Sequence, residues 1–313
     1  NAQVVAAHSD GSEAFMSAAN QQQSVPWSVD GWMLEQIQLA YDQCMEVGCL
    51  LPREGWPVPP YPKHLPDDDP GVRAWRKQAK RIHEKNERTL CARINQAKML
   101  WVARRFADEP CIYFTMSLDF RGRYFYRQPF LNPQGNEACR ALLRFAEGVA
   151  ITNEDEADWL RVHGANVYGM GKHDYRTRVD WVHENQHQIR QVGADPWLRP
   201  EFWLKADKPW QFLAFCRAYK EFSDVGFGYS CRLPVTLDCT CSGIQHYSGL
   251  LRSEGMGAMV NLVDNDQPQD IYGMVMARVL ARLRDSDDPR AGKWLALQPD
   301  RSLSKPIVMT LPY

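Results

Sequence analysis

The sequence has no long hydrophobic run, no repeated cysteine spacing and no large excess of charge of either sign. Its apolar runs are far shorter than the roughly 20 residues of a membrane-spanning helix, so we expect no membrane association. Nine cysteines at irregular spacings, an odd number, indicate free thiols in a reducing compartment rather than a disulfide framework. The formal net charge of −1 excludes a uniformly basic protein, so nucleic-acid binding would require a local basic patch.

The chain also has neither an initiator methionine nor a targeting segment at its start, so we expect it to be an internal piece of a longer protein. What is present is the composition of an ordinary folded protein, with 44% hydrophobic and 24% charged residues. At 313 residues, two or three packed subdomains are expected rather than one compact unit.

Helical periodicity alternates with short β-rich stretches, which predicts an α+β fold that is mainly helical. Seven prolines between Pro52 and Pro70 predict an extended connector before the longest helix. Ser28 or Asp30 is expected to cap the first clear helix. The expected helices cover residues 33–44, 71–106, 154–168, 175–191, 210–222 and most of the chain after 269, and the expected strands cover 111–115, 123–126 and 233–237.

A local basic stripe lies on the longest expected helix, where eleven lysines and arginines between residues 73 and 105 face only two glutamates. Arg73, Lys77, Arg81 and Lys85 recur at helical spacing on one face, which predicts contact with a nucleic-acid backbone. The alternative is a solvated helix face. The apolar residues expected to face the core further along this helix are Leu90, Ile94, Ala97 and Trp101.

Asp238 carries the clearest chemical signal, because it follows an expected strand and precedes a turn of small residues. A carboxylate in that position can present a hard oxygen ligand to Mg²⁺, although a helix N-cap is an equally good interpretation. Near the other end, Arg301 and Lys305 are four residues apart, so a helix would project both from one face toward phosphates. The Cys239 and Cys241 pair could ligate a metal, but small buried residues are the favoured interpretation.

Residues 237–246, LDCTCSGIQH, and residues 301–313, RSLSKPIVMTLPY, resemble the first two polymerase motifs of the single-subunit RNA polymerases of phages and mitochondria. Further matches occur in the family's order, and two of them, NPQGN and HGAN, look more like the phage branch. These matches are DFRGR at 119–123, NPQGN at 132–136, HGAN at 163–166, FLAF at 212–215 and QDIYG at 269–273.

The resemblance implies a role for each matching residue. Asp238 would be one of two catalytic aspartates that bind two Mg²⁺ ions, with the backbone carbonyl of Cys239 as a further ligand. Lys305 would lie closest to the chemistry, and Arg301 would hold the incoming triphosphate. The remaining implied contacts are Lys172 to phosphate, Tyr313 and Tyr272 to the nucleotide and template pocket, and Arg121 and Arg123 to nucleic acid.

The resemblance also implies a right-hand polymerase architecture and its partners. Residues 1–40 would end an N-terminal domain, 41–108 would form a thumb-like segment, 109–250 the palm and 251–313 the beginning of the fingers. The partners would be double-stranded DNA template and promoter, nascent RNA and ribonucleoside triphosphates, bound by a monomer. The expected location is the cytoplasm of an infected bacterial host, with the mitochondrion or plastid as the less favoured alternatives.

Three features depart from the family pattern. Cys239 stands where the family usually has glycine, and Pro306 and Pro312 stand where helix-compatible residues are common. The third motif, His-Asp-Ser, with the second catalytic aspartate, does not occur in the sequence. We therefore expect the chain alone to be inactive, with the second carboxylate outside it.

The sequence is also compatible with three alternative functions. His183, Glu184 and His187 spell HExxH, the helical signature of zinc metallopeptidases, but the extended form of that motif is absent. A DNA polymerase of the related family would carry a glutamate at the position of Gly243, where the missing side chain instead leaves room for a ribose 2′-hydroxyl. A non-catalytic nucleic-acid-binding module is the third.

Overall fold

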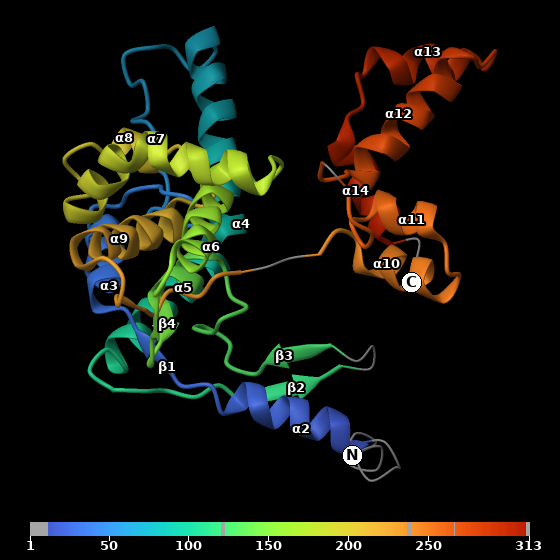
Figure 1. Cartoon of the computed structure of the whole chain (residues 1–313). Helices are drawn as coiled ribbons and strands as arrows, with labels where there is room; N and C mark the ends of the chain where they lie inside the picture. The colour runs from blue at the N-terminus through green and yellow to red at the C-terminus, as the bar shows by residue number, and fades with distance from the viewer. Residues whose placement is uncertain (1–11, 120–122, 237–238, 266, 311–313) are drawn as a thin grey trace. The chain divides into compact units, whose positions relative to one another are not determined.

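The computed structural model describes residues 12–119, 123–236, 239–265 and 267–310 (Figure 1). The chain divides into two compact units. The first comprises Asn1–Met170 with Arg178–Val235, and the second comprises Gly171–Thr177 with Thr236–Tyr313. No helix in the described part of the chain combines the length and the apolar character needed to cross a membrane.

The first unit is mainly helical, as the sequence predicts. Most expected helices occur within a few residues of their predicted bounds, and Asp30 is the cap of α3, accepting a hydrogen bond from the Met33 backbone N–H at 3.0 Å. The helices are α2 (Ser12–Gln23), α3 (Gly31–Asp42), α4 (Pro70–Arg105), α5 (Glu137–Leu142), α6 (Glu154–Ala165), the π-helix η1 (Asn166–Met170), α7 (Tyr175–Ala194), α8 (Pro200–Trp203) and α9 (Pro209–Val225).

The described strands form three separate antiparallel pairs, so the fold is α+β with little sheet. The pairs are β1 (Trp27–Val29) with β4 (Leu143–Phe145), β2 (Met116–Leu118) with β3 (Tyr124–Tyr126), and β5 (Val149–Ala150) with β6 (Ser230–Cys231).

Two predicted strands are wrong. Residues 111–115 contribute only an isolated bridge from Ile112 to Trp27, and the strand begins at Met116. Residues 233–236 contain no strand, because Pro234 cannot donate to a sheet and Val235 is 38% exposed. Leu237, the last residue of that prediction, lies outside the described residues.

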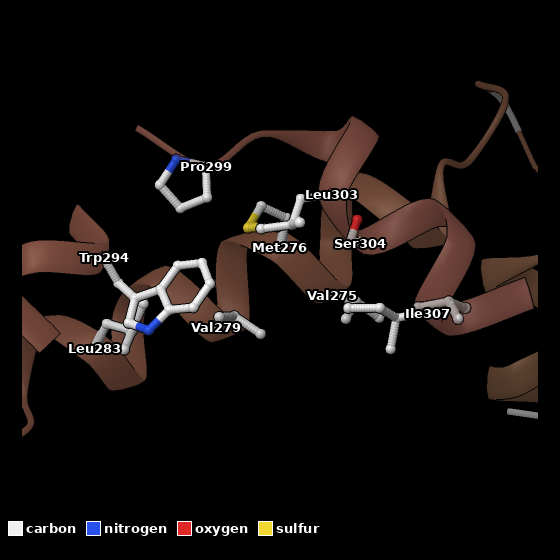
Figure 2. Close-up of a pocket in the computed structure, with 10 residues that line it drawn as sticks. Val275, Met276, Val279, Leu283, Trp294, Pro299, Leu303, Ser304 and Ile307 are labelled. Carbon is white, nitrogen blue, oxygen red and sulfur yellow. The ribbon is translucent and has the colours of Figure 1, made fainter. Parts of the chain in front are cut away.

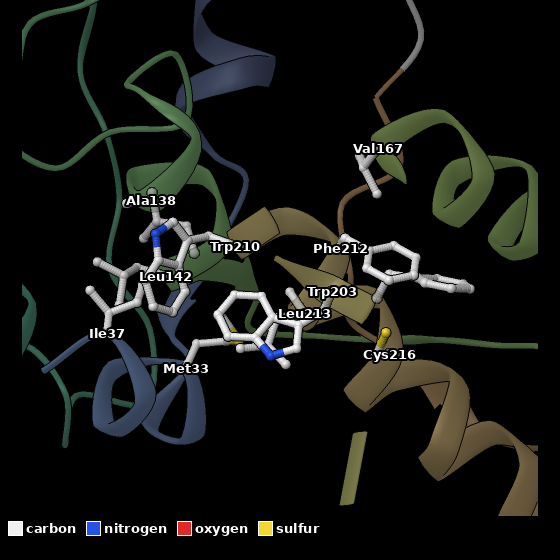
Figure 3. Close-up of a cluster of buried hydrophobic side chains, with 14 of the residues drawn as sticks. Met33, Ile37, Ala138, Leu142, Val167, Trp203, Trp210, Phe212, Leu213 and Cys216 are labelled. Atoms are coloured by element: carbon white, nitrogen blue, oxygen red, sulfur yellow. The ribbon is translucent and has the colours of Figure 1, made fainter. Parts of the chain in front are cut away.

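The core of the first unit is built around the first half of α9, whose side chains are buried on every face (Figure 3). Trp210, Phe212, Leu213 and Cys216 have no exposed surface, and the Trp210 indole nitrogen still donates to the Val47 carbonyl at 3.0 Å. Residues 209–216, the first two turns of α9, are buried on every side, so this half of the helix lies at the centre of the unit. This helix carries the FLAF segment, which therefore has a packing role.

The proline-rich stretch before α4 is an extended connector, as predicted, and it lies along that helix. The Trp56 backbone N–H donates to Asn86 Oδ1 at 2.9 Å, and Asn86 Nδ2 donates back to the Trp56 carbonyl at 2.9 Å. Further along, the Trp75 indole nitrogen donates to the Pro59 carbonyl at 2.8 Å. The connector thereby stabilises α4, which at 36 residues extends beyond the core.

The predicted apolar seam of α4 is wrong. Leu90, Ile94 and Trp101 are 48%, 44% and 62% exposed. The face that packs toward the core is offset around the helix, and its buried members are Gln96, Met99, Leu100 and Ala103. Periodicity cannot separate the two faces, since both carry apolar residues at helical spacing.

The second unit is a smaller helical cluster with its own apolar centre. Its helices are α10 (Ser242–Leu250), α11 (Glu254–Met259), α12 (Ile271–Arg284), α13 (Pro289–Ala296) and α14 (Arg301–Thr310). The centre consists of Cys241, Val260, Ile271, Tyr272 and Val308. It draws on the turn before α10, the first turn of α12 and the last turns of α14, which are the segments with the strongest chemical signals.

Candidate active site

Helix α14 presents a basic side and an apolar side. Lys305 is exposed and Arg301 is partly exposed, whereas Ser304 and Val308 are buried. The helix is continuous through Pro306 even though proline lacks the N–H that would bond four residues back. The sequence prediction that Arg301 and Lys305 occupy one helix is confirmed.

The apolar side of α14 borders a cavity of about 260 Å³ between α12, α13 and α14 (Figure 2). Leu303 and Ile307 from α14 line it together with Val279 from α12 and Trp294 from α13. No charged side chain lines this cavity, so it is not where the chemistry predicted for Arg301 and Lys305 would take place.

Arg301 is held by two residues from the start of α12. Its Nε donates to Asp270 Oδ2 at 2.6 Å, and its guanidinium carbon lies 5.1 Å from the centre of the Tyr272 ring. Ser304, one turn further along α14, donates from Oγ to the Tyr272 carbonyl at 2.8 Å. These contacts fix the rotation of α14 about its axis relative to α12, so they decide which way the basic side faces.

Tyr272 lies beneath this arrangement and is only 5% exposed. Burial, followed by a hydrogen bond with Cys241, raises the pKa of Tyr272 to about 12, so its hydroxyl stays protonated near neutral pH. The prediction that Cys241 is a small buried residue is confirmed, whereas for Cys239 it is wrong, since Cys239 is exposed.

The segment after Asp238 turns sharply into α10. Cys241 has φ 53° and ψ 71°, in the left-handed region, and α10 begins at the next residue. Asn261 holds this segment from the side, because its Nδ2 donates to Thr240 Oγ1 at 2.9 Å and to the Gln269 carbonyl at 2.9 Å. Its Oδ1 also accepts from the Gln269 backbone N–H at 2.7 Å. One side chain therefore ties the residues just after Asp238 to the residue just before Asp270.

Three predicted site residues, Asp238, Arg121 and Tyr313, lie outside the described residues. Gly243 is the second residue of α10, and Cys239 precedes that helix. The structure thus brings Arg301 and Tyr272 into direct contact and places Lys305 one turn beyond Arg301 on the same helix.

Two other predicted contact residues are exposed, as a binding role requires. Lys172 lies in a turn before α7, and Arg123 directly precedes β3, where its backbone N–H donates to Asp119 Oδ1 at 2.9 Å. The Asp119 backbone N–H in turn donates to the Arg123 carbonyl at 2.9 Å, so the first and last residues of the DFRGR match are joined by hydrogen bonds.

The predicted basic face of α4 is present but shorter than expected. Arg73, Lys77 and Arg81 are exposed, and none of them forms an ion pair with another residue in the described ranges. Lys85 differs, because its ammonium lies 3.2 Å from the centre of the Trp56 ring on the connector. Its charge takes part in a cation–π contact, so Lys85 belongs with the connector rather than with the basic face.

The zinc-peptidase alternative gains no support from the structure. His183, Glu184 and His187 are exposed on α7, and none belongs to a group of three or more potential metal ligands among the residues that are described. Two imidazoles one turn apart, without a third ligand, fit a solvated helix face.

Sequence reasoning missed three residues that organise this site, namely Asp270, Asn261 and Ser304. Each acts through a long-range or backbone-directed hydrogen bond that periodicity does not reveal. Asp270 lies within the QDIYG match, so the family pattern could have drawn attention to it. The sequence gives no sign that its side chain pairs with Arg301.

Comparison with known proteins gives one consistent result. Residues 151–313 match the family described as DNA-dependent RNA polymerase. The DNA-directed RNA polymerase of Enterobacteria phage T3 is 32% identical over 95% of this chain and 36% of its own length. The T7 RNA polymerase of Escherichia phage T7 is 34% identical over 82% of this chain and 32% of its own length. A mitochondrial DNA-directed RNA polymerase 1B of Nicotiana tabacum is 32% identical over 92% of this chain and 30% of its own length. The chain thus spans about a third of the length of the curated relatives it matches.

Proposed function

Since the chain belongs to the family of single-subunit DNA-dependent RNA polymerases, we propose that it supplies the triphosphate-binding half of an active site for DNA-templated RNA synthesis. The observation that carries this proposal is the basic side of α14, where Arg301 and Lys305 stand one turn apart and α12 fixes their direction. Two cations at that spacing suit the closely spaced negative charges of a triphosphate.

Magnesium is the cofactor that the family implies, and the donors in this chain fit it. The carboxylate of Asp238 and the backbone carbonyl of Cys239 are hard oxygen ligands of the kind that Mg²⁺ prefers. When bound, two such ions stabilise charge on the attacking and leaving oxygens of nucleotidyl transfer. This chain would provide one of the two carboxylates, and a longer polypeptide that contains it would provide the other.

The other residues of the site would bind the triphosphate, the nucleotide and the template. Arg301 would hold the triphosphate, and Lys305 would neutralise charge closest to the reacting phosphate, with Lys172 as a further phosphate contact. Tyr313 would border the nucleotide and template, whereas Tyr272, which is only 5% exposed, would support the Arg301 side chain from within the unit. Gly243, in the first turn of α10, would leave room for the ribose 2′-hydroxyl, which favours RNA over DNA synthesis.

Nucleic acid would contact the exposed basic residues outside this site, namely Arg73, Lys77, Arg81, Arg121 and Arg123. In the right-hand polymerase arrangement, residues 41–108 would act as the thumb, 109–250 as the palm and 251–313 as the start of the fingers. The partners would be a double-stranded DNA template with its promoter, the nascent RNA and ribonucleoside triphosphates. The chain would act as a monomer in the cytoplasm of an infected bacterial host, and the phage relatives support that location.

Binding of GTP with magnesium to the 313-residue chain tests the proposal. We expect a variant with Arg301→Ala and Lys305→Ala to bind GTP at least about tenfold more weakly, because two charge-assisted hydrogen bonds to phosphate are removed. Lys293→Ala is the matched control, since it removes an exposed lysine from α13 in the same unit. Equal affinity for GTP in the double variant and the control would show that α14 does not bind the triphosphate.

A further inference from the structure

Asp270 holds Arg301 through one particular nitrogen. The hydrogen bond of 2.6 Å runs from Nε, the inner nitrogen of the guanidinium, to Asp270 Oδ2. The two terminal nitrogens make no hydrogen bond to any residue in the described ranges, and the Arg301 side chain is 36% exposed. A planar guanidinium fixed at Nε therefore keeps its two terminal nitrogens available for bidentate contact with a phosphate.

The Asp270 carboxylate accepts this hydrogen bond from Arg301 and does not cap its own helix. Asp270 stands at the N-cap position of α12, where a carboxylate commonly accepts a backbone N–H, yet its side chain makes no capping hydrogen bond. Its other oxygen, Oδ1, is enclosed without a hydrogen-bond partner among the described residues. Among the described residues, the Asp270 carboxylate therefore accepts a hydrogen bond from Arg301 and none from the backbone at the start of α12.

Gly273 supplies the space that the carboxylate occupies. A Cβ atom at residue 273 would lie 3.1 Å from Asp270 Oδ2, closer than an ordinary van der Waals contact. Since Oδ2 is the atom that accepts from Arg301, a side chain at 273 would require the acceptor to shift by a few tenths of an ångström. Glycine at 273 leaves Asp270 Oδ2 in place without this displacement.

Electrostatics alone would argue against a carboxylate here. Its negative charge offsets the attraction between Arg301 and an incoming triphosphate, so it cannot strengthen binding by charge. What it offers is orientation, because an arginine side chain otherwise loses much rotational freedom when it grips a phosphate. The Tyr272 ring on one side and the Ser304 hydrogen bond to the Tyr272 carbonyl complete the support.

We propose that Asp270 is a positioning residue for triphosphate binding, which aligns the terminal nitrogens of Arg301 by holding its Nε. The inference rests on the proposed function, since it assigns to Arg301 a triphosphate as ligand. It adds a specific requirement, namely that the acceptor at position 270 matters for its geometry and not for its charge.

The affinity of the 313-residue chain for GTP with magnesium distinguishes geometry from charge. Asp270→Asn keeps an oxygen acceptor for Nε, so we expect its dissociation constant to stay within about threefold of the unmodified chain. Asp270→Ala removes the acceptor, and we expect about tenfold weaker binding. The Nε–H resonance of Arg301 in an NMR spectrum, assigned by its loss in Arg301→Lys, should persist in the Asn variant and shift in the Ala variant.

Two further variants serve as controls. Asp288→Ala breaks a second aspartate–arginine pair of 2.6 Å in the same unit, with Arg290, and should leave GTP binding unchanged. Gly273→Ala should weaken GTP binding although alanine is the better helix former, so affinity and helix stability would move in opposite directions. It also tests the idea independently if Asp270→Ala fails to fold.

The outcomes separate this inference from the proposed function. If Arg301→Ala leaves GTP binding unchanged, the triphosphate site itself is wrong. If Arg301→Ala weakens binding while Asp270→Ala leaves it unchanged or strengthens it, only the positioning role is overturned. Equal weakening in Asp270→Asn and Asp270→Ala would also overturn it, since an oxygen acceptor at position 270 would then not be enough to position Arg301.

Discussion

Burial of His163 in α6 makes the stability of the first unit depend on pH. The side chain is 2% exposed, and burial, followed by the positive charge of Lys208, lowers its pKa to about 4. In the unfolded chain the imidazole titrates near a pKa of about 6.5. Between about pH 6.5 and about pH 4 the unfolded chain therefore binds more protons, so the free energy of unfolding falls as the pH falls, by about 1.4 kcal/mol per pH unit for this group.

Urea unfolding followed by tryptophan fluorescence measures this effect, because ten of the eleven tryptophans precede residue 236. We expect His163→Leu to lose less stability than the unmodified chain when the pH is lowered from about 7 to about 5. Parallel decreases in stability in the two proteins would show that His163 is not the group responsible.

The residues of the candidate site differ in how far the sequence could predict them. Arg301 and Lys305 could be predicted from the sequence, because a spacing of four residues places two side chains on one face of any helix. Asp270 and Asn261 could not be predicted, since their hydrogen-bond partners are 31 and 21 residues away and depend on how helices pack. Side-chain partners across elements follow from tertiary structure, which local sequence does not encode.

At the scale of elements, α4 offers the clearest test of nucleic-acid binding. Changing Arg73, Lys77 and Arg81 together to glutamine should weaken DNA binding and reduce the slope of log affinity against log salt by about one unit for each phosphate that is no longer neutralised. Arg76→Gln with Lys80→Gln is the matched control, because these two cations are paired with Asp67 and Glu84. If the triple variant keeps the salt slope of the unmodified chain, this face is merely solvated.

Helices were predicted more reliably than strands for a physical reason. The long helices, α4 and α7 above all, repeat their pattern over many turns, so one ambiguous residue changes little. The strands are two or three residues long, too short for an alternating pattern to develop. The misplaced apolar seam of α4 shows a further limit, because a helix that extends past its core exposes residues that would be buried elsewhere.

At the scale of the whole molecule, we expect the 313-residue chain alone to show no template-directed RNA synthesis with magnesium and ribonucleotides. Two-metal transfer requires two carboxylates that hold the ions about 4 Å apart, and the sequence supplies one that matches the family pattern. Incorporation of labelled ribonucleotides on a DNA template measures this. Synthesis by the chain alone would reveal a second metal-binding carboxylate within it.

Comparison of Asp238→Asn with the unmodified residue, in a full-length polypeptide that contains this chain, tests the polymerase assignment most directly. The substitution keeps the shape of the side chain and removes the charge that would bind the metal. We predict that template-directed ribonucleotide incorporation falls by about 1,000-fold, or about 4 kcal/mol, while binding to the DNA template is unchanged. Incorporation at the unmodified rate would contradict the assignment of Asp238 to the catalytic metal site, and with it the proposed function of the chain.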